Sequence, residues 1–174
     1  MKKGFWILLL LLVLAVTGIV LYIPRVQKKI AFVNVNQLYN EFEMKKELEA
    51  TLTNVLKGRH QQLDSLELEL KLLNSKIESD GARDKNLIQN FEEKRQGYLL
   101  KKNQFEEDNR MMQEDYTTKI MKQLNQYVTD YGKENVYQYI LGAEGSGAIM
   151  YAEETEDITK TVKEFINQKY KGKK

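Results

Sequence analysis

The sequence contains no cysteine, and it has only one proline and one histidine among its 174 residues. The absence of cysteine excludes disulfides, thiol catalysis, cysteine-ligated metals and a lipid anchor on cysteine. The single histidine, His60, lies beside Arg59 in a charged segment and has no second histidine with which to bind a metal ion. No serine stands in a nucleophile pattern. We therefore expect no catalytic residues, no metal site and no cofactor.

A concentrated basic surface is also missing. The chain has 27 Lys and Arg residues against 25 Asp and Glu residues, a net charge of +2. Nucleic-acid binding depends on a dense basic face, so this balance argues against it. The one cluster of glycines, in residues 142–147, is not followed by lysine or by a helix. It is typical of a turn between strands and not of a phosphate-binding loop.

One long apolar run stands at the N-terminus, where residues 4–23 carry no charge. At about 1.5 Å per residue, a helix of this length spans roughly 30 Å, the thickness of a bilayer core. Phe5, Trp6 and Tyr22 lie at the ends of the run, where aromatic residues meet membrane interfaces. The run is longer than the apolar core of a signal peptide. Residues 1–24 are therefore predicted to form an uncleaved transmembrane signal anchor, with a cleaved signal peptide as the alternative.

The middle of the chain, residues 38–132, predicts an arm of two long helices. Apolar residues recur at alternating spacings of four and three, which is the pattern of a coiled-coil seam. The first helix carries the seam Leu52, Leu56, Arg59, Leu63, Leu66, Leu70, Leu73 and Ile77. The second carries Phe91, Tyr98, Phe105 and Met112, each seven residues after the last.

The sequence Asp80-Gly81 between the two helices predicts a tight turn. Folding the chain back at this turn brings Leu70 near Phe91 and Leu63 near Tyr98. We therefore expect an antiparallel helical hairpin with leucine packed against aromatic residues.

Short strands flank this arm. Residues 30–35, which follow a linker that starts at residue 25, are β-branched or aromatic and predict one strand before the arm. Residues 136–142 and 148–151 predict two strands after it, joined as a hairpin, and Asp157 predicts the start of a last helix. The body therefore comprises residues 25–37 and 133–170, with a basic tail at 171–174. The fold class is α+β, with the arm inserted between strands of a sheet too small to bury itself.

These segments resemble the Skp/OmpH family of periplasmic chaperones. "KIAFVNVNQLYNEF" is similar to that family's first strand and its entry into the arm, and "LKGRHQQLDSLELELKLL" is similar to its first arm helix. "YGKENVYQYILGAEGSGAIMYAEETEDIT" is similar to its closing strands and the start of its last helix. The likeness covers Lys29 to about Asn167.

The resemblance implies a homotrimer with a small β-barrel body and three arms around a cavity. It implies an ATP-independent holdase that shields unfolded outer-membrane proteins in the periplasm. Residues 4–23 depart from the family, whose members usually carry a cleaved signal peptide, and predict that this chain is anchored to the inner membrane. The trimer body would use apolar residues of the predicted strands: Ile30, Phe32, Val33, Val35, Tyr139, Ile140, Leu141, Ile149 and Tyr151. The residues predicted to contact clients are Tyr98, Phe105, Met111, Met112 and Tyr116.

A second interpretation assigns the chain to a different class of protein. A membrane-anchored coiled-coil scaffold or spacer of the cell envelope would also need long helices and an anchor, but it would hold no client. Strands around the base of the arm distinguish the two interpretations, because a spacer has no need of them.

Overall fold

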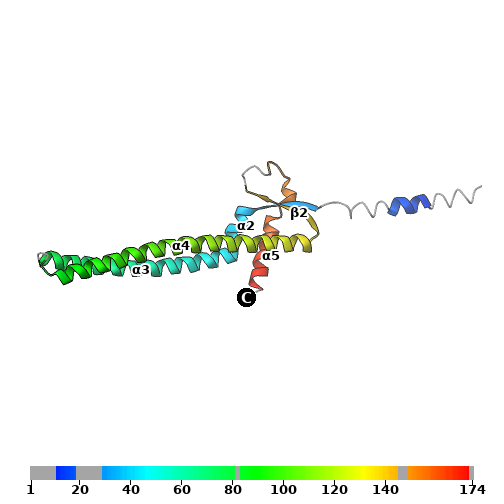
Figure 1. Cartoon of the computed structure of the whole chain (residues 1–174). Coiled ribbons are helices and arrows are strands. Elements are labelled where there is room, and N and C mark those ends of the chain that lie inside the picture. The colour runs from blue at the N-terminus through cyan, green and yellow to red at the C-terminus, as the bar shows by residue number, and fades with distance from the viewer. Residues whose placement is uncertain (1–10, 19–28, 81–82, 145–148, 173–174) are drawn as a thin grey trace, which may run out of the picture.

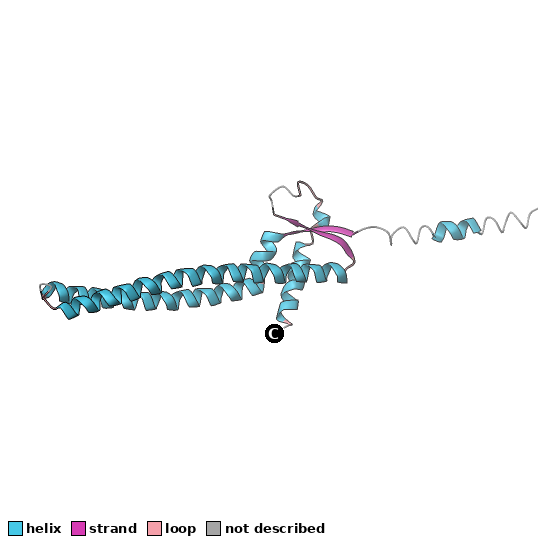
Figure 2. Ribbon diagram, in the orientation of Figure 1, coloured by secondary structure: helices cyan, strands magenta, loops and turns pink. Residues whose placement is uncertain are grey.

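The computed structural model describes residues 11–18, 29–80, 83–144 and 149–172. Its strands are β1 (Lys29–Asn34) and β2 (Tyr137–Ala143). Its helices from residue 29 onward are α2 (Val35–Glu41), α3 (Glu43–Ser79), α4 (Lys85–Glu134), the short 3-10 helix η1 (Glu154–Glu156) and α5 (Thr159–Lys171). Figures 1 and 2 show α3 and α4 side by side as a long arm, which projects from a small body made of the strands, α2, α5 and the near end of α4.

The predicted antiparallel hairpin of helices is present. Asp84 begins α4 by accepting hydrogen bonds from the backbone N–H groups of Asn86 and Leu87, at 2.9 and 3.2 Å. This cap satisfies two of the N–H groups that a helix start leaves unpaired. The predicted seam positions of α3 are all half-buried, whereas no residue of α3 is fully buried. The arm is therefore a narrow two-helix structure with solvent on every other side.

The two strands pair in parallel, with Lys29 opposite Tyr137 and Asn34 opposite Ala143. The lengths of the arm helices explain this direction. α4 has 50 residues and α3 has 37, so at about 1.5 Å per residue α4 returns roughly 20 Å beyond the start of α3. That excess is close to the length of the six-residue strand β1. The chain therefore re-enters the sheet beside the beginning of β1 and runs in the same direction.

The predicted strand hairpin after the arm is wrong. Residues 149–151 are not in a strand, and residue 148 lies outside the described residues. The described residues form a single two-stranded sheet, so the expected β-barrel body is not found. β1 meets residue 157 only through an isolated bridge, in which Ile158 N–H donates to the Phe32 carbonyl at 3.1 Å. The parallel pairing of β2 with β1 takes the place of the antiparallel pairing that the Gly-rich turn suggested.

The expected transmembrane helix is also not supported. Among the described residues, no helix has both the length and the apolar character needed to cross a membrane. Of the predicted segment 4–23, only residues 11–18 are described, as eight helical residues. At about 1.5 Å per residue these span only about 12 Å. The rest of the segment lies outside the described residues.

The hydrophobic core lies at the base of the arm. Its fully buried side chains come from α2, α4, α5 and the break before α3: Leu38, Phe42, Leu124, Tyr127, Val162 and Ile166. Each such side chain contributes about 1.5–3 kcal/mol by its removal from water. α5 starts beside β1 and crosses the arm at this point, as Figure 2 shows, and its Val162 and Ile166 pack into the core.

Phe42 separates α2 from α3, where the sequence predicted one helix from residue 38. Its backbone is extended, with φ −75° and ψ 125°. Its ring packs edge-on against Tyr127, at 6.1 Å between centroids, and against Tyr170, at 5.6 Å. Asn167 of α5 bridges the break, because its side chain accepts from Glu43 N–H at 2.9 Å and donates to the Glu41 carbonyl at 3.1 Å. The interruption therefore places an aromatic ring in the core while these backbone groups stay paired.

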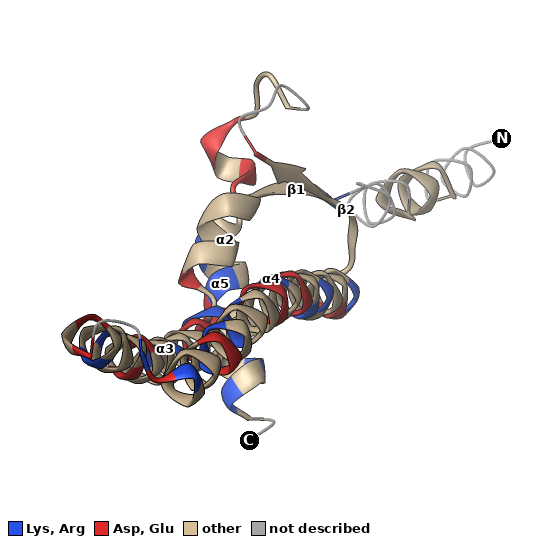
Figure 3. Cartoon of the chain, turned by 60° about the vertical axis from the view of Figure 1, so that its left-hand side comes forward, with Lys and Arg blue, Asp and Glu red and all other residues tan. Residues whose placement is uncertain are grey.

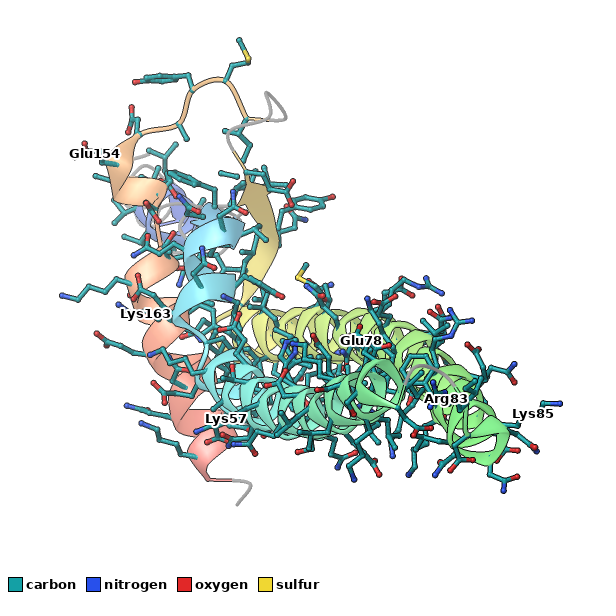
Figure 4. All side chains as sticks on the ribbon, turned by 90° about the vertical axis from the view of Figure 1, so that its left-hand side faces the viewer. Lys57, Glu78, Arg83, Lys85, Glu154 and Lys163 are labelled. Atoms are coloured by element: carbon teal, nitrogen blue, oxygen red, sulfur yellow. The ribbon has the colours of Figure 1, made fainter. Side chains whose placement is uncertain are left out.

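Ion pairs join α5 to the base of the arm. Lys169 Nζ lies 2.8 Å from Asp130 Oδ2 of α4. Lys163 Nζ lies 2.7 Å from Glu41 Oε2 of α2, and Figure 4 shows Lys163 on the α5 ribbon beside α2. Lys169 lowers the pKa of Asp130 by hydrogen bonding to its carboxylate, and Gln126 adds a second hydrogen bond.

We predict that Asp130→Asn lowers the stability of the fold at neutral pH but not in acid. The pKa of Asp130 is lower in the folded chain than its usual value of 3.8, so the ion pair stabilises the fold above that pH. The stabilisation is lost as the pH falls through the folded pKa. Urea unfolding should therefore show a difference between wild type and variant at pH 7 that becomes smaller at pH 2.5.

Asp115→Asn is the control. Asp115 pairs only with Lys119, four residues along the exposed surface of the same helix, at 2.6 Å. This variant should change the unfolding free energy little at either pH, because exposed pairs of this kind contribute little. Equal effects of the two substitutions would contradict the role given to Lys169.

Candidate functional site

An exposed apolar surface lies on one face of the sheet. Because side chains alternate between the faces of a strand, Ile30 and Phe32 of β1 share a face with Tyr139 and Leu141 of β2. Ile30 is opposite Tyr139, and Phe32 is opposite Leu141. We call these four residues the open sheet face. Ile30, Tyr139 and Leu141 are 46%, 57% and 45% exposed, which is unusual for large apolar residues of a sheet centre.

A cavity of about 600 Å³ opens on this face. Its floor is made by Ile30, Phe32 and Leu141, and its opposite wall by Ile149, Tyr151 and the acidic residues Glu153 and Glu156. Tyr151 is 83% exposed in the single chain. The cavity is therefore a largely apolar groove whose charged lining residues are Lys29, Glu153 and Glu156, and it is wide enough to receive side chains from another polypeptide.

The remaining residues predicted for the trimer body point elsewhere. Val33 is buried in the core, on the opposite face of β1 from Phe32. Ile140 is half-buried and lies over Gly132 of α4, where its Cδ1 atom would be 3.3 Å from an added Cβ. Val35 begins α2 instead of ending the strand. The structure thus divides the predicted set into an open sheet face and residues that join the sheet to the helices.

Arg59 interrupts the apolar seam of the arm. Its side chain is only 19% exposed, and its guanidinium lies over the ring of Phe105 at 5.1 Å. The guanidinium also donates to the Asn109 side chain and to Asp108 Oδ2, the latter at 3.4 Å. Four side chains therefore form one polar layer across α3 and α4. A layer of this kind specifies the register of two helices in a way that repeating leucines cannot.

The residues predicted to contact clients have different environments. Met111 is exposed, whereas Tyr98, Met112 and Tyr116 are half-buried along the seam. Phe105 is half-buried. The Arg59 guanidinium lies 5.1 Å from the centroid of its ring, and Lys101 Nζ lies 5.5 Å from it. Of this set, Met111 presents the most surface to another molecule in the single chain.

The surface of the arm is charged and balanced. Figure 3 shows residues of both signs along α3 and α4, and residues 41–131 contain 15 Lys and Arg against 18 Asp and Glu. Some pairs connect the two helices, such as Lys94 and Glu69 at 2.7 Å. Figure 4 views the arm from its tip, and there Lys85 extends away from the helices. The arm therefore offers no extended surface of a single charge.

The carboxylates with shifted pKa values each have a Lys or Arg partner. Among the described residues, no three His, Asp or Glu side chains lie where they could share a metal ion. The carboxylates whose pKa is shifted are all shifted downward by a hydrogen bond from Lys or Arg: Glu41, Glu67, Glu107 and Asp130. A general acid needs the opposite shift.

The sequence predicted the open sheet face only in part. The apolar strands predicted a sheet too small to bury itself, but the pairing of Ile30 with Tyr139, about a hundred residues later in the chain, depends on the lengths of the two helices between them. Exposed leucines of the arm were not predicted. Leu68, Leu72 and Leu100 are more than half exposed, and a helical wheel drawn around the seam would have placed them outside it.

Comparison with known proteins gives a consistent result. The family described as "Outer membrane protein (OmpH-like)" matches residues 29–166. The chaperone protein Skp of Yersinia enterocolitica is 29% identical over 139 residues, which cover 77% of this chain and 83% of that protein. The chaperone protein Skp of Pectobacterium atrosepticum is also 29% identical over 139 residues, covering 77% and 82%.

A solved structure shares the fold. It is the crystal structure of an OmpH-like outer membrane chaperone from Caulobacter crescentus CB15. The two structures superpose with a TM-score of 0.70 at 12% sequence identity, covering 82% of this chain and 85% of the other.

We predict that Arg59→Ala loosens the middle of the arm and leaves the body unchanged. The substitution removes the stacking on Phe105 and the bonds to Asp108 and Asn109, with an expected cost of about 1 kcal/mol because the site is partly exposed. Hydrogen exchange should accelerate in the middle of α3 and α4 but not in α5. Arg59→Lys should restore little, since lysine lacks the planar fork. Unchanged exchange in the arm would contradict the role of this layer.

Proposed function

Because the chain belongs to the OmpH-like outer membrane protein family, we propose that it is a holdase chaperone of the periplasm. It binds unfolded outer-membrane proteins and keeps them from aggregating, without ATP. The chaperone names of the Skp relatives support this proposal. The structural observation that carries it is the arm, whose long helices have a half-buried seam and project from the only core in the described chain.

An arm of this kind suits the binding of disordered clients. It offers a long surface, because α4 spans about 75 Å at 1.5 Å per residue. Contacts along that surface are individually weak and become effective when many act together. A client that remains disordered loses little conformational entropy on binding. Met111, which is exposed on α4, belongs to this contact surface in our proposal.

We further propose that copies of the chain associate through the open sheet face, as a homotrimer. Ile30, Tyr139 and Leu141 would leave water on association, and the groove beside them would accept side chains of the next copy. A second copy suits this place because its own sheet offers the same apolar residues. Association here would gather several arms around one body, so that a client meets more than one of them.

Shortening both arm helices by one heptad should weaken client protection. Deleting residues 64–70 together with 91–97 removes facing segments, including both members of the Glu69–Lys94 pair. The heptad phase is retained, and the arm becomes about 10 Å shorter. Light scattering of a urea-unfolded outer-membrane β-barrel protein, diluted into the chaperone, should show more aggregation than with the wild type.

Two results would separate the possible functions. A wild-type chain that does not suppress aggregation at all would overturn the holdase proposal and favour a scaffold. Equal protection by the shortened arm would leave the chain a holdase but would show that arm length is not part of its mechanism. Circular dichroism provides the check that the shortened chain is still folded.

Leu141→Asp should dissociate the oligomer and leave each chain folded. Leu141 is 45% exposed in the single chain, so a carboxylate there can remain hydrated after dissociation but would be buried in the associated form. Leu100→Asp is the control, because Leu100 lies on α4 of the arm and is 73% exposed. Sedimentation equilibrium should give monomers for the first variant and the wild-type mass for the second. A wild-type mass for both would contradict association through the open sheet face.

A further inference from the structure

One side of α3 has no charged residue over most of its length. Six residues at spacings of four and three share this side, and we call them the α3 stripe: Asn54, Gly58, Gln61, Ser65, Leu68 and Leu72. At 100° per residue they fall within about 80° of one another, on the side opposite the seam residues Leu63 and Leu70. All except Gly58 are exposed.

The lack of charge is specific to this side of the helix. Thirteen of the 37 residues of α3 are Asp, Glu, Lys or Arg, yet none of them belongs to the stripe. Lys57 and Asp64 flank the stripe along one side and Glu69 flanks it along the other, whereas Glu47 and Lys76 lie on the same side of the helix beyond its two ends. A binding partner would therefore not have to remove water from charged groups along this line, which would be costly.

The amide side chains of the stripe are available for hydrogen bonding. Elsewhere on the arm, amides donate to a carboxylate four residues later: Asn74 to Glu78 at 2.7 Å, and Gln89 to Glu93 at 2.9 Å. The fourth residue after Asn54 is Gly58, which offers no such acceptor. Within the described part of the chain, the amide of Asn54 makes no hydrogen bond.

The amide of Gln61, like that of Asn54, has no carboxylate acceptor four residues later on the helix. The fourth residue after it is Ser65, whose hydroxyl donates to the Gln61 carbonyl at 2.8 Å, and the amide of Gln61 has no partner among the described residues. Both amides can therefore donate to and accept from a polypeptide backbone.

Two leucines and a groove complete the surface. Leu68 and Leu72 are four residues apart on α3 and are 59% and 57% exposed. Next to them, a groove of about 510 Å³ is lined by Gly58, Gln61 and Ser65 of the stripe and by Lys101 of α4. A Cβ atom added at Gly58 would have nothing within 4 Å. The surface thus combines apolar contact, amides and open space.

We propose that the α3 stripe is the surface through which α3 binds clients, and that its partner is an extended, uncharged stretch of unfolded polypeptide. This inference rests on the proposed holdase function. The stripe is about 27 Å long, which matches about eight residues of extended chain. Strands of an outer-membrane β-barrel alternate apolar and polar side chains. Such a segment can place apolar side chains on Leu68 and Leu72 and pair its backbone with the amides.

A second helix suits the stripe less well than an extended chain does. A helix packed in coiled-coil fashion needs large apolar residues at nearly every position of the facing stripe. Here Leu68 and Leu72 meet that requirement, whereas Asn54, Gly58 and Gln61 do not. An arm of another copy of the chain is therefore an alternative that the experiment must exclude.

The test compares full-length variants in equilibrium binding of a fluorescent, urea-unfolded outer-membrane β-barrel protein at 150 mM salt. Leu68→Glu with Leu72→Glu should weaken binding about ten-fold. Asn54→Asp with Gln61→Glu should do so as well, because these changes add charge with almost no change of shape. The matched control is Leu99→Glu with Thr117→Glu, which places two charges on exposed residues of α4 about 120° around the helix from Met111 and should change binding by less than about two-fold.

Each outcome has one meaning. No binding by the wild type would overturn the holdase function itself. Binding by the wild type, with an unchanged affinity in both stripe variants, would overturn only the role of the stripe. A changed sedimentation mass in the stripe variants would show a contact between copies and would also overturn it. Because the chain has no cysteine, a photoreactive probe on Ser65→Cys gives an independent check. It should cross-link to the client more than the same probe on Thr117→Cys, which lies on a side of α4 away from Met111.

Discussion

The parallel pairing of β1 with β2 joins segments that the whole arm separates. Lys29 lies opposite Tyr137, and the 37- and 50-residue helices between them must leave the body and return in one fixed relation. The excess length of α4 sets the register of the sheet, and the sheet in turn fixes where α4 ends. The core residues Leu124 and Tyr127 lie on that excess length, so the same constraint places them beside Phe42 and Ile166. The pairing also orients Ile30 and Leu141 toward solvent.

The sequence was most informative where structure is local. Heptad spacing from Leu52 to Ile77 depends only on neighbouring turns of one helix, and the predicted seam is half-buried at each position. The turn at Asp80 and the cap at Asp84 are likewise short-range features. Prediction failed for the sheet, because strand partners are chosen by distant parts of the chain. The Gly-rich turn suggested a local hairpin, but β2 gains more by pairing with β1 above the core than by pairing with residues 149–151.

The break at Phe42 was missed for a related reason. Nothing in the helix propensity of residues 38–48 requires an interruption, and the residue is extended because its ring fits between Tyr127 and Tyr170. The candidate surfaces divide in the same way. The apolar strands indicated that the body needs a partner. Which side chains form the open sheet face depends on the register in which β1 pairs with β2. The α3 stripe follows from the period of α3 once the seam is known, because the side of the helix opposite the seam carries no charge between residues 48 and 75.

The arm can also be considered as a mechanical element. α4 runs without a break from the tip into the core, where Ile120, Leu124 and Tyr127 hold it, so it behaves as a beam clamped at one end. α3 has no fully buried residue and is attached to the root through Phe42 and the ties to Asn167. The bending moment from a load at the tip is therefore largest at the core, where α4 is held most firmly. The displacement of the arm increases along the half-buried seam toward the tip. The arm can follow the shape of a bulky load while the core at its root keeps its geometry.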